Sequence, residues 1–145
     1  AQGQVLLNME TLWQQAYPSE CVIVRPTGIY GTSVTRMIKL TETTKSYPKL
    51  HWSNRIHIDD LVAFLAHLLH VEHTEKSYIC SNSQPLPLHE IIQWFQQQLG
   101  FPTLVLESDV SSGKQIHATR MQQMNFELQH PHCFDDYLVL LEKRE

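Results

Sequence analysis

The fold is decided by residues 21–31, which read Cys21-Val22-Ile23-Val24-Arg25-Pro26-Thr27-Gly28-Ile29-Tyr30-Gly31. The first four residues form a continuous apolar run with β-branched side chains, a pattern typical of a strand buried on both faces of a parallel sheet. The last five are rich in turn-forming residues, so we expect a loop that leaves the carboxyl end of this strand. Ligands of open α/β sheets bind beyond such strand ends, which makes this loop a candidate binding element.

Outward from this stretch, helical patterns alternate with short apolar runs. We expect an amphipathic helix that opens the chain and ends at Pro18, and further helices near residues 35–40, 60–71, 88–99, 117–124 and 134–143. Asp59 or Asp60 should cap the second of these further helices, and Gly100 should end the third. Strands are expected at residues 21–24, 78–80 and 104–106, with a brief extended segment at 54–58. We also expect Trp13, Trp94, Phe95 and Leu99 in the core. This alternation predicts an α/β fold, with fewer strands than an open doubly wound sheet normally has.

Composition narrows the class of protein. The chain of 145 residues is 42% hydrophobic and 18% charged, a balance typical of one globular domain. The net charge of −4 does not favour nucleic acid as a partner. The longest apolar stretch, residues 61–71, contains His67 and His70 and is too short to cross a bilayer. Three cysteines without a CxxC pair, and no secretory signal, favour a reducing, cytoplasmic location.

Three motifs occur in a characteristic order: Arg25-Pro26-Thr27-Gly28-Ile29-Tyr30-Gly31, then Asn54-Arg55-Ile56-His57-Ile58-Asp59-Asp60-Leu61, then Ser77-Tyr78-Ile79-Cys80-Ser81-Asn82 before Pro85. The ordered set resembles the C-terminal half of the extended short-chain dehydrogenase/reductases, the NAD-dependent epimerase/dehydratase family, from about Val5 to Leu141. The resemblance implies a partial Rossmann-like parallel sheet and a smaller C-terminal substrate domain. Residues 1–31 would be the last part of the dinucleotide-binding domain and residues 32–145 the substrate-binding portion.

The resemblance also implies NAD or NADP as cofactor of the full-length protein, and a small-molecule substrate such as a nucleotide sugar. The loop Pro26, Thr27, Gly28 and Ile29 would lie beside the nicotinamide. The five glycines do not form the clustered turn that lets a backbone approach a pyrophosphate, and no Tyr is followed four residues later by Lys. We therefore leave the catalytic residues unassigned. We expect a fragment that is inactive alone and exposes an edge strand and apolar faces, so that it either self-associates as a homo-oligomer or is only marginally stable.

Two arginines and one histidine are candidate substrate-binding residues. Arg36 and Arg55 could each bind a phosphate through a bidentate guanidinium, or be ordinary solvated surface residues. His57 lies next to Asp59 and Asp60, which could indicate acid–base chemistry, although helix capping already explains the carboxylates.

The nine histidines raise the question of a metal. Two groups of histidines are candidate ligands. On a helix, positions three residues apart turn progressively away from one face, so His67, His70 and His73 would converge poorly on one ion. The second group is the short stretch His130-Pro131-His132-Cys133, whose members are close together in the sequence. We therefore expect no metal centre. The leading hypothesis is a nucleotide-sugar epimerase/dehydratase or reductase. The alternatives are a non-catalytic NAD(P)-sensing or partner-binding protein of the same fold and a histidine-rich metal-binding protein. A Tyr-x-x-x-Lys pair upstream would favour the enzyme.

Overall fold

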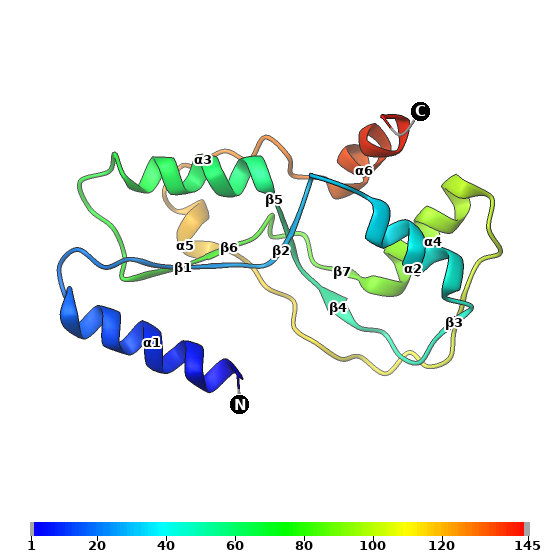
Figure 1. The fold of residues 1–145 in the computed structure, drawn as a ribbon, viewed down its shortest axis with the longest axis horizontal. Coiled ribbons are helices and arrows are strands. Elements are labelled where there is room, and N and C mark those ends of the chain that lie inside the picture. The colour runs from blue at the N-terminus through cyan, green and yellow to red at the C-terminus, as the bar shows by residue number, and fades with distance from the viewer. Residues whose placement is uncertain (1, 144–145) are drawn as a thin grey trace.

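The computed structural model describes residues 2–143 and consists of two lobes joined by a central pair of strands (Figure 1). In the first lobe, β1 (Ile23–Pro26) pairs in parallel with β6 (Ser77–Cys80). Helix α1 (Gln2–Ala16) lies on one side of these strands, and α3 (Ile58–Leu68) and α5 (Thr119–Gln122) lie on the other.

The second lobe is mainly helical. Helices α2 (Thr35–Thr43) and α4 (Leu88–Leu99) pack against each other, and α6 (Cys133–Glu142) covers them from above in Figure 1. Its short strands form two more pairs: β3 (Ser46–Tyr47) with β8 (Val105–Leu106) in parallel, and β4 (Trp52–Ser53) with β7 (Leu86–Pro87) in antiparallel orientation. The central pair is β2 (Gly28–Tyr30) with β5 (Arg55–His57), again parallel. The predicted α/β class, with parallel sheet pieces, is confirmed.

Each lobe has its own hydrophobic core. Buried side chains of the first core come from β5, β6, α3 and α5 and from the residue before α5: Ile56, Leu61, Phe64, Tyr78, Cys80, Ala118 and Met121. Those of the second core come from β2, α2, α4 and α6 and the residue before α2: Tyr30, Val34, Ile38, Ile91, Phe95, Cys133 and Tyr137. The chain therefore passes between the cores several times, and β1 pairs with a strand far beyond residue 31. The predicted division of the chain into a dinucleotide-binding part, residues 1–31, and a substrate-binding part, residues 32–145, therefore stays a prediction about function.

The predicted helices are all present, but several expectations need correction. The first strand begins two residues later than expected, at Ile23, and the run 21–24 is not buried on both faces, since all four residues are only half-buried. The predicted loop 27–31 contains strand β2, and β3, β4 and β7 were not expected. Trp13 is 55% exposed and not in the core, whereas Phe95 is fully buried.

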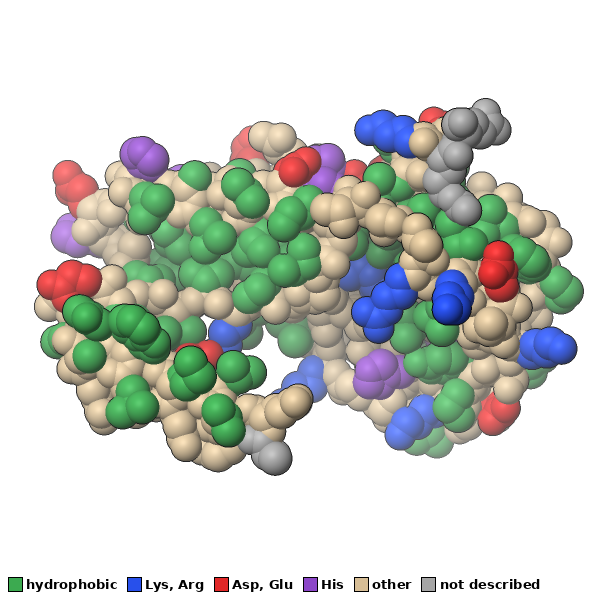
Figure 2. Space-filling model, viewed as in Figure 1, with side chains coloured by type: hydrophobic (Ala, Val, Ile, Leu, Met, Phe, Trp, Pro, Cys, Tyr) green, Lys and Arg blue, Asp and Glu red, His purple; other side chains and the backbone are tan. Residues whose placement is uncertain are grey.

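Helix α1 carries more exposed large apolar side chains than any other described helix or strand. None of its residues is buried, and its exposed large apolar side chains are Val5, Leu6, Leu7, Met9, Leu12 and Trp13. They gather on the helix at the lower left of Figure 2. Polar contacts attach the helix: Glu10 pairs with Arg25, and Gln14 donates to the Lys76 carbonyl over 3.2 Å. The expected exposed apolar face is present. No described helix is long and apolar enough to cross a membrane.

Candidate functional site

The loop that leaves β1 is held tightly to its neighbours. The Thr27 amide and hydroxyl both donate to the Cys80 carbonyl, over 2.9 Å and 3.1 Å, and the Gly28 amide donates to the Asn54 carbonyl over 3.0 Å. A Cβ on Gly28 would lie 3.0 Å from that same carbonyl oxygen, so a side chain here would push the two backbones apart by a few tenths of an ångström. The predicted cofactor loop therefore has a fixed backbone at the carboxyl ends of β1 and β6.

The β2–β5 pair brings the two predicted residue sets together. Gly28 is the register partner of Arg55, and Tyr30 is the partner of His57. Adjacent strands are about 4.8 Å apart. Two of the three predicted substrate residues therefore lie directly beside the predicted cofactor loop.

Arg55 is half-buried and is held by hydroxyl groups. Its Nε donates to the Tyr137 hydroxyl over 3.0 Å, and one terminal nitrogen donates to Ser53 Oγ over 2.8 Å. Burial raises the pKa of Tyr137, so the phenol stays neutral beside the guanidinium. Among residues 2–143, no carboxylate forms a salt bridge with Arg55. Its positive charge is therefore positioned and still free to attract an anion.

An open pocket of about 420 Å³ lies next to this loop and is lined by Arg25, Pro26, Thr27, Gly28, Asn54, Ile79 and Ile116. Asn54 organises its wall, because its Nδ2 donates to the Lys114 carbonyl and its Oδ1 accepts from the Ile116 amide, both over 2.8 Å. The polar side chain of Asn54 thus fixes a segment some sixty residues further along the chain beside the cofactor loop.

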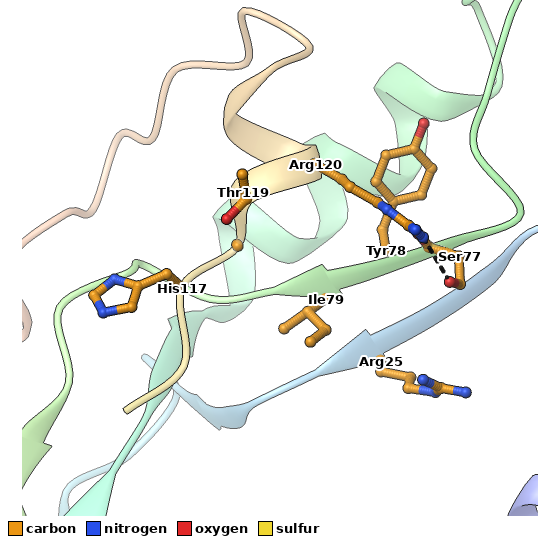
Figure 3. Close-up of a pocket in the computed structure, with 8 residues that line it drawn as sticks. Arg25, Ser77, Tyr78, Ile79, His117, Thr119 and Arg120 are labelled. Carbon is orange, nitrogen blue, oxygen red and sulfur yellow. Dashed lines mark hydrogen bonds between the residues drawn. The ribbon is translucent and has the colours of Figure 1, made fainter. Parts of the chain in front are cut away.

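A second pocket, of about 260 Å³, lies along β6 and contains two arginines (Figure 3). Arg120 is occupied there, because one of its terminal nitrogens donates to both the carbonyl and the hydroxyl of Ser77, over 2.9 Å and 3.0 Å. Arg25 pairs with Glu10 and extends away from Arg120. The Arg120 contacts lie at Ser77, the first residue of β6, whereas ligands of α/β sheets bind at the carboxyl ends of the strands. We therefore assign this pocket no role.

Arg36 does not join the site. It lies on α2 with an exposed side chain, and within residues 2–143 it has no side-chain hydrogen bond or salt bridge. Its assignment as a substrate residue stays a prediction.

Helix α3 is capped by a residue other than those predicted. His57 Nδ1 accepts from the Asp59 amide over 3.2 Å, so histidine is the cap. Asp60 is 1% exposed and binds elsewhere: its two oxygens accept from the Gln129 and His130 amides over 2.8 Å and 3.0 Å. The expectation that Asp59 or Asp60 caps this helix is wrong, because Asp60 holds the segment before α6 instead.

A cluster at this corner was not predicted. Tyr30 donates to Asp136 Oδ2 over 2.6 Å, and His130 Nδ1 lies 2.6 Å from Asp136 Oδ1. The rings of His57 and His130 stack with centroids 3.7 Å apart and 15° between their planes. Burial, followed by the hydrogen bond to Asp136, raises the pKa of Tyr30 far above its usual range. In the sequence, the only indication of this cluster was the stretch His130-Pro131-His132-Cys133, which places potential ligands close together.

The comparisons with known proteins identify the fold. No family model and no curated protein matches the sequence. A solved structure from Methylobacillus flagellatus, assigned as an NAD-dependent epimerase/dehydratase, is 32% identical with a TM-score of 0.84, over 99% of this chain and 54% of that one.

Two more distant structures share the fold. The dTDP-glucose 4,6-dehydratase of Bacillus anthracis in complex with NAD is 17% identical with a TM-score of 0.68, over 94% of this chain and 49% of that one. The Bordetella bronchiseptica enzyme WbmG in complex with NAD and UDP is 13% identical with a TM-score of 0.57, over 85% and 43%. The chain spans about half the length of these structures. The chain has the structure of the C-terminal portion of an extended short-chain dehydrogenase/reductase of the NAD-dependent epimerase/dehydratase family.

Proposed function

We propose that these residues form the substrate side of an NAD-dependent epimerase/dehydratase that acts on a nucleotide sugar. The observation that carries the proposal is the register of β2 with β5, in which Gly28 of the predicted cofactor loop is the partner of Arg55. Similar solved structures contain NAD, and one also contains UDP, which makes NAD the first cofactor and UDP the first substrate fragment to test. When bound, NAD supplies the hydride chemistry, and the protein supplies orientation.

The residues of the site have different proposed roles. Pro26, Thr27, Gly28 and Ile29 form a rigid floor beside the nicotinamide, because two hydrogen bonds from Thr27 and one from Gly28 fix the backbone. Arg55 binds a substrate phosphate with the guanidinium edge that its two hydroxyl partners leave free.

His57 is 5% exposed, so we assign it a positioning role at the corner between β5 and α3. In this proposal, residues 1–31 belong with the dinucleotide-binding domain and residues 32–145 with substrate binding. The chain alone is inactive, because none of its glycines forms a clustered phosphate-binding turn. The three free cysteines support the predicted cytoplasmic location.

The test is a titration of the 145-residue chain with UDP, followed by NMR of the backbone amides. We expect weak binding, with the largest shifts at residues 27–31 and 53–57. Arg55→Ala should weaken UDP binding at least about tenfold, the typical effect of losing a charge-assisted phosphate contact. Arg36→Ala removes the same charge from an exposed helix and should change the affinity little. An unchanged affinity in Arg55→Ala, with weaker binding in Arg36→Ala, would overturn the assignment.

A further inference from the structure

A group of potential metal ligands lies where α3 begins, beside the segment that leads into α6. One atom each from His57, Asp59 and His130 lies within 4.8 Å of the other two. His57 Nδ1 is 3.7 Å from Asp59 Oδ2, and His130 Nε2 is 3.8 Å from the same oxygen. Among the residues that the structure describes, no other set of histidine, cysteine and carboxylate groups meets in this way.

We propose that His57, Asp59 and His130 form a binding site for a divalent transition metal, with Zn²⁺ as the ion that the ligand set fits best. Two imidazoles and one carboxylate are a common zinc ligand set, with water in the fourth position. Tetrahedral bonds of about 2.0–2.1 Å place neighbouring ligand atoms about 3.4 Å apart. The two distances to Asp59 are within about 0.4 Å of that value. The Asp59 side chain is 70% exposed and can move to close the difference. The His57 and His130 rings stack with 15° between their planes, so the His130 ring must also turn out of this stack for both nitrogen lone pairs to point at one ion.

Existing hydrogen bonds orient both histidines for metal binding. His130 Nδ1 lies 2.6 Å from Asp136, a carboxylate that fixes the proton on Nδ1 and leaves the Nε2 lone pair toward Asp59. Metal-binding histidines typically have such a carboxylate partner, which orients the ring and increases its basicity. His57 Nδ1 already acts as an acceptor toward the Asp59 amide, and this 3.2 Å contact is the one that an ion would replace.

The surrounding groups leave Asp59 as the available carboxylate. Each oxygen of Asp60 already accepts a hydrogen bond, from the Gln129 or His130 amide, and each oxygen of Asp136 already has a partner in Tyr30 or His130. The histidines further along α3 offer no comparable set, since His70 Nδ1 already bonds the Ala66 carbonyl over 2.7 Å. The cluster was missed in the sequence because His130 approaches α3 only in the folded chain.

An ion at this corner would connect three segments. His57 and Asp59 belong to the start of α3, His130 precedes α6, and Asp136 extends the network to Tyr30 on β2. Binding would therefore stabilise the folded chain in proportion to the logarithm of the free metal concentration.

The experiment uses Co²⁺ as the probe, because tetrahedral Co²⁺ gives a visible absorption band when bound. The chain is freed of metal with a chelator and titrated with Co²⁺, and Zn²⁺ is then added in competition, with the melting temperature as a second readout. We expect one equivalent of Co²⁺ to bind, Zn²⁺ to displace it, and the melting temperature to rise with Zn²⁺ concentration. His130→Gln and Asp59→Asn should each weaken binding at least about tenfold.

The controls make the result decisive. His132→Gln changes an exposed histidine two residues from His130, bonded to Gln84, and should leave the affinity unchanged. Asp59→Asn alters an exposed side chain, so it tests the site even if His130→Gln folds poorly. The proposal is overturned if no Co²⁺ binds at about 0.1 mM, a concentration well above that needed to saturate protein metal sites. It is also overturned if Asp59→Asn binds normally, or if His70→Gln abolishes binding.

Discussion

Replacing Gly31 by alanine should destabilise the chain because two penalties coincide at this position. The Gly31 backbone has φ +114°, a conformation that residues with a side chain rarely adopt. An added Cβ would lie 2.3 Å from His57 Nε2 and 2.6 Å from Cδ2 of the same ring. His57 cannot easily move away, since it is buried, stacks on His130 and caps α3.

The expected loss is the sum of a backbone and a packing contribution. The backbone conformation costs roughly 1–3 kcal/mol for a non-glycine residue, and forcing a methyl group into a filled space costs roughly 1–3 kcal/mol more. The free energy of unfolding should therefore fall by roughly 2–6 kcal/mol, a large part of the stability of a typical domain. Gly100→Ala is the matched control, because Gly100 has φ +71° and nothing lies within 4 Å of its added Cβ. It should lose only the backbone contribution, roughly 1–2 kcal/mol.

The assay is urea unfolding of both variants and the parent chain, followed by far-ultraviolet circular dichroism. We expect Gly31→Ala to lose at least about 1 kcal/mol more than Gly100→Ala. Equal losses in the two variants, within about 0.5 kcal/mol, would refute the claim that His57 fills the space beside Gly31.

Three further predictions concern cysteines, pH and self-association. Burial raises the pKa of Cys80 to about 12 and of Cys133 to about 11. Both thiols should therefore react with a disulfide reagent at least about 100-fold more slowly in the folded chain than in the unfolded chain. Equal reaction rates in the folded and unfolded chains would contradict this prediction. Burial lowers the pKa of His57 from 6.5, so the unfolded chain takes up a proton on this residue at a higher pH than the folded chain does. An NMR titration of the folded chain should therefore place the His57 midpoint below 6.5. As pH falls from about 7 to that midpoint, protonation of His57 should lower the free energy of unfolding. A midpoint above 6.5 would exclude the buried position. Leu12 is exposed on the apolar face of α1, so Leu12→Lys should reduce self-association in sedimentation velocity without lowering the melting temperature, whereas a monomeric parent chain would argue against this face as a contact.

Local signals explain which elements were predictable. Helix α4 has the expected bounds, because its start follows Pro87, its apolar positions recur at helical spacing, and Gly100 ends it in the left-handed conformation. Strand β1 was misplaced by two residues, because its limits depend on pairing with β6 rather than on its own apolar run. The apolar pattern of α1 correctly predicted an amphipathic helix, but a pattern cannot reveal whether anything covers Trp13.

The site shows the same limit between local and long-range information. The motifs around Gly28 and Arg55 were recognisable by composition and order, and the structure pairs them in register. The contacts of Tyr30 with Asp136, 106 residues away, leave no local pattern, so this part of the cluster could not be predicted. Histidine is not among the favoured capping residues, which explains why the carboxylates after His57 were chosen as the cap.

A fluorescence titration of the 145-residue chain with NADH tests most directly whether these residues hold the substrate side of the fold without a phosphate-binding turn. We expect no tight binding, with no saturation below about 1 mM NADH, because helix-terminal phosphate binding needs a glycine-rich turn that none of the five glycines forms. Saturation at micromolar NADH would mean that a complete dinucleotide site lies within these residues, and it would contradict the proposed division of roles.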